Sequence, residues 1–193
     1  MQELKRPKIV IHSADENAFL TRSELLDRLE LKHLFYPKMK ASALKIHRIE
    51  RSISSMPEVK HVEVFKHLGG RWEIILELRQ PIARIFNKKG QSYYLDQDGF
   101  MMNRSTLHTA RVLVFSGYIW DAYNPRVNYD FINNPNLKSS QKISQIYHIS
   151  NYVCNDPLMH KLIGQVYLEA DGDFILIPIL GDQQIIFGQV RTA

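Results

Sequence analysis

The sequence lacks most of the features that fix a fold or a chemistry by themselves. Cys154 is the only cysteine, so no disulfide can form within the chain. No apolar run approaches the roughly 20 residues of a membrane-spanning helix, and residues 1–8 are too polar for a signal peptide. The sequence also has no Gly-rich phosphate loop and no HExxH, GxSxG or CxxC motif. These absences favour a binding protein over an enzyme without excluding the enzyme.

Charge of neither sign dominates the chain. Its 193 residues include 25 Lys and Arg against 20 Asp and Glu, mixed along the sequence, for a formal net charge of +5. This bias is compatible with an anionic neighbour, such as membrane headgroups or nucleic acid, but an ordinary charged surface explains it as well. Hydrophobic residues make up 45% of the chain, enough for one domain or two small ones without a metal or a disulfide.

The first part of the chain shows apolar periods typical of both strands and helices. Thr21 and Glu24 have the spacing of a capping box, and Ser42 is a candidate N-cap for a second helix that ends before Pro57. The predicted elements are strands at 8–13, 59–67 and 71–79, a helix at 22–33, and a helix with the apolar stripe Ile46, Ile49, Ile53 and Met56. The order predicts a three-stranded sheet backed by two helices.

A domain boundary is predicted at Gln80. Apolar and polar residues alternate from Trp72 to Arg79, which is the period of a strand with one buried face. Pro81 has no N–H for a sheet and restricts the residue before it, so the strand is expected to end there. We therefore expect one domain at 8–80 and a second at 81–190.

The second part of the chain predicts a strand-rich layer with helical cover. Asn87–Gly90 and Ala170–Asp173 have the composition of hairpin turns. The predicted elements are strands at 82–86, 92–96, 111–116, 165–169, 174–178 and 183–188, a long loop at 118–136, a helix at 137–155 and a short helix at 158–163. The fold class is α+β.

Candidate catalytic and metal-binding residues are few. Asp96 and Asp98 could divide acid and base roles, but Asp-Gln-Asp-Gly is more often turn chemistry, as is the stretch around Asp171. His61 and His67 would stand roughly 20 Å apart on one strand, too far to share a metal. No cofactor or metal is predicted.

The aromatic residues and the cysteine also have structural explanations. Trp72, Tyr93 and Tyr94 could stack on bases or sugars, but aromatic residues in strands are more often core partners. Cys154 lies on an apolar helix face and is expected to be a buried free thiol. The two-helix, three-strand order also occurs in RNA-binding KH modules, but residues 35–41 contain no glycine for their Gly-x-x-Gly loop.

The residues around the predicted boundary carry a resemblance. They are Glu77, Arg79, Pro81, Ile82, Ala83, Asn87, Gly90, Tyr93, Tyr94, Asp96 and Gly99, with Pro57, Val59, Val62, Val64 and Lys66 upstream and Ile185, Ile186 and Gly188 downstream. Together they resemble the FtsQ/DivIB family of cell-division proteins over residues 9–188. The resemblance implies a POTRA-like β-α-α-β-β module followed by a strand-rich β domain.

The resemblance also implies a function. FtsQ proteins are non-enzymatic scaffolds of the bacterial divisome that join the small bitopic proteins FtsB and FtsL and help to assemble the septal wall-synthesis machinery. One N-terminal helix anchors them in the inner membrane, with the folded domains in the periplasm. The resemblance therefore implies a natural protein that is longer than this chain at its N-terminus. No nucleic-acid partner is expected.

Two stretches are expected to bind partners. In the family the second strand of the POTRA module takes part in recruitment contacts, and the matching positions are His61, Val64 and Lys66. Val64 is explained at least as well as a core residue.

The second stretch lies near the end of the chain. The FtsB-binding strand of the family follows the I-x-x-G motif and a helix, and it has no counterpart before Ala193. We expect either a truncation at the C-terminus, which is the favoured interpretation, or a natural protein that differs from the family there. Gln183, Ile185 and Phe187 are then expected on an exposed apolar edge that is open to a partner or to self-pairing.

Two rival functions stay open. POTRA modules also act as chaperone-like binders in outer-membrane assembly and secretion proteins, where they usually occur in tandem, and this sequence shows no repeat. An enzyme with an unrecognised site in the second domain would show a deep pocket with convergent titratable groups.

Overall fold

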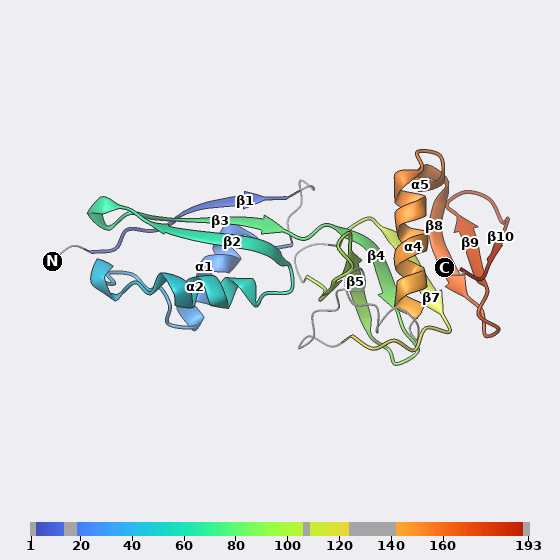
Figure 1. Ribbon diagram of the computed structural model, residues 1–193, viewed down its shortest axis with the longest axis horizontal. Coiled ribbons are helices and arrows are strands. Elements are labelled where there is room, and N and C mark those ends of the chain that lie inside the picture. The colour runs from blue at the N-terminus through green and yellow to red at the C-terminus, as the bar shows by residue number, and fades with distance from the viewer. Residues whose placement is uncertain (1–2, 14–18, 106–108, 124–141, 191–193) are drawn as a thin grey trace. The chain divides into compact units, whose positions relative to one another are not determined.

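The computed structural model describes residues 3–13, 19–105, 109–123 and 142–190 (Figure 1). The chain divides into two compact units. The first comprises Met1–Gln80 and Ser105–His108, and the second comprises Pro81–Arg104 and Thr109–Ala193.

The first unit is a three-stranded sheet with two helices on one face (Figure 1). Its elements are β1 (Lys8–His12), α1 (Arg22–Leu31), α2 (Ile46–Ser54), β2 (Val59–Lys66) and β3 (Trp72–Leu78), with 3₁₀ turns at Ala41–Ala43 and Leu68–Gly70. The strand β3 is central, and it pairs in parallel with β1 and antiparallel with β2. The predicted β-α-α-β-β order is confirmed, and the predicted strands differ by at most one residue at each end.

The core of the first unit lies between the sheet and the helices. Every second residue of β3, from Trp72 to Leu78, is buried, as the alternation predicts. The helix residues in the same cluster include Leu25, Leu26, Leu29, Ile49 and Ile53. Burying one such side chain contributes about 1.5–3 kcal/mol, so this cluster fixes which face of each strand points outward.

The first helix begins as predicted and ends early. Thr21 Oγ1 accepts the N–H of Glu24 at 3.2 Å, which confirms the N-cap. The helix stops at Leu31 rather than His33, since His33 has a positive φ of 53° that no α-helix accommodates.

The predicted start of the second helix is wrong. Ser42 lies in a 3₁₀ turn, and α2 begins at Ile46 after Lys45, which makes no side-chain cap. Leu44 is buried in an extended conformation just before the helix. Its burial therefore overrides the local preference of Ser42 to begin a helix.

The second unit is built on a seven-stranded sheet in the order β10-β9-β8-β7-β4-β5-β6. Its elements are β4 (Pro81–Phe86), β5 (Ser92–Asp96), β6 (Met101–Met102), β7 (Leu113–Gly117), α4 (Lys142–Asn155), α5 (Met159–Leu162), β8 (Ile163–Leu168), β9 (Phe174–Pro178) and β10 (Ile185–Gly188). The strand β7 pairs in parallel with β4 and β8, and the other neighbours are antiparallel. The predicted strand-rich domain with helical cover is confirmed.

The helix α4 covers one face of this sheet (Figure 1). Its buried side chains include Ile143, Ile146, Ile149 and Val153, which share a core cluster with residues of six strands, β4 to β9. The hydroxyl of Ser150 is also buried, and it donates to Ile146 O at 2.7 Å. This buried hydroxyl is thus satisfied within the helix.

Several predicted boundaries in the second unit are wrong. Pro81 is the first residue of β4, a position where a strand tolerates the missing N–H. Ile163, predicted to be helical, begins β8, and β10 begins at Ile185 rather than Gln183. The two-residue strand β6 was not predicted because two residues show no period.

Two predictions are covered only in part. The predicted loop at 118–136 lies outside the described residues beyond Tyr123, and the predicted helix at 137–155 lies outside them before Lys142.

Candidate functional site

The strand β2 is one edge of the three-stranded sheet and carries three predicted binding residues. His61 is exposed, with its Nε2 3.5 Å from Glu63 Oε1. Three positions separate His61 from Val64, so their side chains lie on opposite faces of the strand. The structure therefore does not bring the predicted residues together on one face.

Val64 belongs to the core of the first unit, with a side chain only 6% exposed. Its side chain is thus not on the surface, because the alternation that buries Val62 also buries Val64. The core interpretation is correct for this residue. Its backbone N–H donates to Glu50 Oε1 of α2 at 3.2 Å, across the edge of the strand.

Lys66 also points along this edge. Its Nζ donates to Ala41 O at 2.8 Å, in the segment before α2. The side chains of Glu50 and Lys66 therefore join β2 to the α2 region, and Glu50 occupies a backbone donor that a partner strand would otherwise use. Sequence reasoning missed Glu50, because its polar character on a helix surface gives no signal that it faces a strand.

The strand β10 is an edge of the seven-stranded sheet and ends it on the side of β9. Ile185, Ile186 and Phe187 are all exposed, Ile186 by 77%. The pairing with β9 shifts register between Ile186 and Gly188. Gln183 is exposed but lies outside the strand. Three consecutive apolar side chains thus lie on an edge strand that, among the described residues, pairs with β9 alone.

A residue of α4 extends this apolar surface. The ring of Tyr152 lies 6.3 Å from that of Phe187, and both are exposed. Tyr152 falls off the apolar stripe of its helix, which is the signal that places it on the outer surface. Its position beside β10 could not be predicted, because it depends on how the helix packs on the sheet.

The carboxylates considered as candidate functional groups stabilise turns instead. Asp96 Oδ1 accepts the N–H groups of Asp98 at 3.0 Å and Phe100 at 2.6 Å. Asp171 Oδ1 accepts the N–H of Asp173 at 3.1 Å. The turn interpretation of both stretches is confirmed.

Burial shifts the pKa values of Asp121 and Cys154 in the second unit. Burial raises the pKa of Asp121, although backbone N–H groups of Lys142 and Ile143 at the start of α4 favour its ionised form. Burial also raises the pKa of the half-buried Cys154 thiol, whose Sγ lies 3.9 Å from Ile82 O. A raised pKa keeps the thiol protonated, so it is not poised as a nucleophile.

Within the described residues no three His, Cys, Asp or Glu side chains gather as metal ligands would. None of the helices in that part of the chain is both long and apolar enough to cross a membrane.

Comparison with known proteins assigns both units. A model of the family described as FtsQ/DivIB, C-terminal related, matches residues 80–193, and a model of a POTRA-like domain matches residues 5–77. No curated protein matches the chain. The FtsQ/DivIB family consists of non-enzymatic cell-division proteins that are membrane-anchored and have an extracytoplasmic domain. Because the first match spans more than half of the 193 residues, the chain belongs to the FtsQ/DivIB family, with a POTRA-like domain ahead of the family's C-terminal domain.

Proposed function

We propose that this chain is a scaffold of the bacterial divisome that binds small bitopic division proteins of the FtsB and FtsL kind by strand addition at β10. It works without catalysis in the periplasm, beside the inner membrane, and helps to assemble the septal wall-synthesis machinery. Membership in a non-enzymatic division family supports the scaffold role. The exposed apolar edge of β10 is the observation that supports this place of binding.

Strand addition suits β10 because an edge strand offers backbone N–H and C=O groups to an extended segment. Backbone hydrogen bonds then supply affinity, and side chains that alternate along the strand supply specificity. Ile186 would be covered by such a segment, and fully burying an isoleucine contributes about 1.5–3 kcal/mol. Phe187 and Tyr152 would add an aromatic contact on the side of α4.

The β2 edge is the weaker candidate for strand addition, because Glu50 already bonds the Val64 N–H there. A recruitment contact at β2 would instead use its exposed side chains. Of the predicted residues, His61 is exposed there, whereas the Nζ of Lys66 already donates to Ala41 O.

The two rival functions have less support. Residues 5–77 match a POTRA-like domain, and residues 80–193 match the division family, which favours a division protein over a tandem chaperone-like binder. The carboxylates that could have supported an enzymatic role instead accept hydrogen bonds from backbone N–H groups in turns.

The test is an NMR titration of the 193-residue chain with soluble stems of FtsB-type and FtsL-type proteins. We expect shifts in the amides of β10 and β9, and an affinity about tenfold lower for Ile186→Lys, because a charge replaces an apolar contact. Leu180→Lys is the matched control, since Leu180 is 83% exposed just before β10 and lies outside the strand. The control should bind as the wild type does.

Two results would overturn the proposal. Equal loss in both variants would show a general effect of positive charge. Binding only by a chain that continues past Ala193 would place the contact outside β10.

A further inference from the structure

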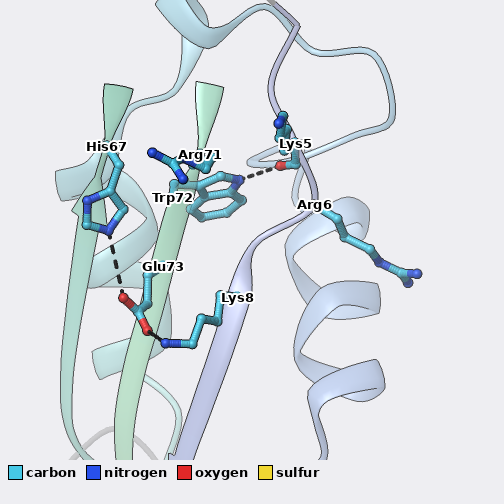
Figure 2. A pocket seen from close by; sticks show the side chains of 7 residues that line it. All are labelled: Lys5, Arg6, Lys8, His67, Arg71, Trp72 and Glu73. Atoms are coloured by element: carbon cyan, nitrogen blue, oxygen red, sulfur yellow. Dashed lines mark hydrogen bonds and ion pairs between the residues drawn. The ribbon is translucent and has the colours of Figure 1, made fainter. Parts of the chain in front are cut away.

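The end of the first unit that carries the β2–β3 turn gathers positive charge around a pocket (Figure 2). The pocket has a volume of about 450 Å³ and is lined by Lys5, Arg6, Lys8, His67, Arg71, Trp72 and Glu73. These residues come from the segment before β1, from β1 itself and from both sides of the turn. The lining thus holds four Lys and Arg residues and one carboxylate, and Figure 2 shows the Arg6 side chain pointing away from that carboxylate.

Backbone hydrogen bonds hold this end together. The N–H of Lys5 donates to Gly70 O at 2.9 Å, and the N–H of Leu4 donates to Met39 O at 2.7 Å. Trp72 is buried, and its Nε1 donates to Lys5 O at 2.8 Å, as Figure 2 shows. The cationic segment is thus fixed in place across the turn.

The carboxylate of Glu73 neutralises only part of this charge. Its oxygens lie 2.6 Å from Lys8 Nζ and 3.7 Å from His67 Nε2 (Figure 2). The hydrogen bond from Lys8 lowers the pKa of Glu73, so the carboxylate is already engaged. Among the described residues, the side-chain nitrogens of Lys5 and Arg6 have no partner.

An apolar side chain stands in the same turn. Leu68 is 89% exposed, although the Nε of neighbouring Arg71 donates to its carbonyl at 3.4 Å. Gly69 and Gly70 have positive φ values of 79° and 68°, which glycine adopts without strain. The turn is thus a tight one that presents an exposed leucine next to Arg71.

The surrounding chain adds to the positive charge. Residues 32–51 contain six Lys and Arg residues and one acid, so this segment carries the net charge of +5 and the other residues sum to zero. Within it, Lys40 pairs with Glu3 in a backbone bridge next to the Leu4–Met39 hydrogen bond. The part of this segment around Met39 and Lys40 therefore reaches the pocket end of the unit, whereas Arg48 and Arg51 line a different pocket.

We propose that this end of the first unit binds the phosphate groups of an anionic phospholipid surface, with Lys5, Arg6 and Arg71 on the headgroups and Leu68 in the interfacial layer. Lysine and arginine near an anionic bilayer strengthen binding, and an exposed apolar residue among them favours a surface with an apolar interior. A nucleic acid or a free phosphate ion would leave Leu68 without a role. The choice of a lipid surface also rests on the membrane anchoring of the family.

The test is flotation of the full 193-residue chain with vesicles that contain phosphatidylglycerol, at low and high salt. Each basic residue near an anionic surface contributes about fivefold to the partition coefficient, so Lys5→Gln with Arg71→Gln should lower it about 25-fold. Leu68→Ser should lower it about fivefold or more, because the leucine no longer enters the interface. High salt should weaken the binding of the wild type.

The matched control is Arg48→Gln with Arg51→Gln. Both residues are exposed on α2 and line a second basic pocket. Their substitution removes two positive charges, as the Lys5 and Arg71 substitutions do. We expect this variant to change the partition coefficient by less than about twofold, because charges away from the contact are screened. An equal loss in the two double variants would overturn the proposed site.

Three further experiments distinguish the anionic lipid surface from other ligands. Equal binding to vesicles of phosphatidylcholine alone would exclude recognition of anionic headgroups. Release from vesicles by inorganic phosphate at constant ionic strength would indicate a site for the free ion. Tighter binding to duplex DNA than to vesicles would indicate a nucleic-acid surface. Each result would overturn the proposal.

A failure of the lipid-binding proposal can be distinguished from a failure of the strand-addition proposal at β10. The pocket and β10 belong to different units. Lys5→Gln with Arg71→Gln should therefore bind the FtsB-type and FtsL-type stems as the wild type does, whatever happens on vesicles.

Discussion

The two edge strands that carry the predicted binding residues, β2 and β10, differ in how far their side chains and backbone are already engaged. On β2 the side chain of Val64 is buried and its N–H is bonded to Glu50, and the neighbouring Lys66 reaches Ala41 O. On β10 the exposed side chains of Ile185–Phe187 are apolar. The first edge is joined to the helix side of its own unit, whereas the second offers both apolar and backbone groups to the outside.

This difference indicates which edge is prepared for a partner. Proteins protect edge strands with charged side chains, bulges or a covering element, because an open edge pairs with other chains. The first unit uses Glu50 and Lys66 in this way. Apart from the register shift between Ile186 and Gly188, the described residues give the apolar β10 edge no such protection. Such an edge is a liability unless a partner covers it, which is why β10 is the better candidate for strand addition.

The largest expected effect comes from placing a carboxylate on each edge. We expect Val64→Asp to lower the free energy of unfolding by more than about 3 kcal/mol, because it puts an unpaired charge into the core. Ile186→Asp should lower it by less than about 0.5 kcal/mol, since the side chain is already in water. Urea denaturation followed by circular dichroism and tryptophan fluorescence measures both.

Equal losses of stability in these two variants would contradict the contrast between the edges. They would mean either that Val64 reaches solvent or that Ile186 is buried in solution.

Much of the fold could be predicted from the sequence because local patterns and core burial agree there. The alternation from Trp72 to Leu78 predicts both the strand and its buried face, and Thr21 with Glu24 predicts the start of α1. The prediction at Ser42 failed because Leu44, two residues before the apolar stripe that begins at Ile46, is buried in an extended conformation, and its burial decides where α2 begins. A helix cap stabilises by about 1 kcal/mol, whereas burying a leucine side chain contributes about 1.5–3 kcal/mol, so burial outweighs the capping preference.

The candidate site could be predicted less completely. The apolar run Ile185–Phe187 signals an exposed edge only if the strand is known to end the sheet, and strand order depends on long-range pairing. The burial of Val64 follows from its two-residue spacing to Val62. The contact of Glu50 with β2 joins residues 14 positions apart and has no local signal.

A smaller effect should follow from opening the protected edge. Glu50→Gln keeps an acceptor but removes its charge, and we expect a loss of about 1 kcal/mol, because a partly exposed charge-assisted hydrogen bond is replaced by a neutral one. Asp27→Asn is the matched control, since Asp27 is exposed on α1. Hydrogen exchange should also become faster at the Val64 amide.

Unchanged exchange at Val64 would show that the carboxylate does not protect this edge. Equal destabilisation by the control would show a general effect of removing a negative charge from the positively charged chain.

The smallest expected effect is a pH dependence of opposite sign in the two units. Lys8 lowers the pKa of Glu73 below its ordinary 4.5, and burial raises the pKa of Asp121 above its ordinary 3.8. A lowered pKa stabilises the fold above the unfolded pKa, and this contribution is lost as the pH falls through the folded pKa. A raised pKa stabilises the fold below the unfolded pKa, and this contribution is lost as the pH rises through the folded pKa.

The matching variants are Glu73→Gln and Asp121→Asn, measured by thermal unfolding from acidic to neutral pH. The wild type should be more stable than Glu73→Gln at neutral pH, and this difference should shrink on acidification. Asp121→Asn should gain stability relative to the wild type as the pH rises, because the wild type then ionises a buried carboxyl while the amide stays neutral. If both differences move in the same direction with pH, the two carboxyls do not have the opposite environments that the structure gives them.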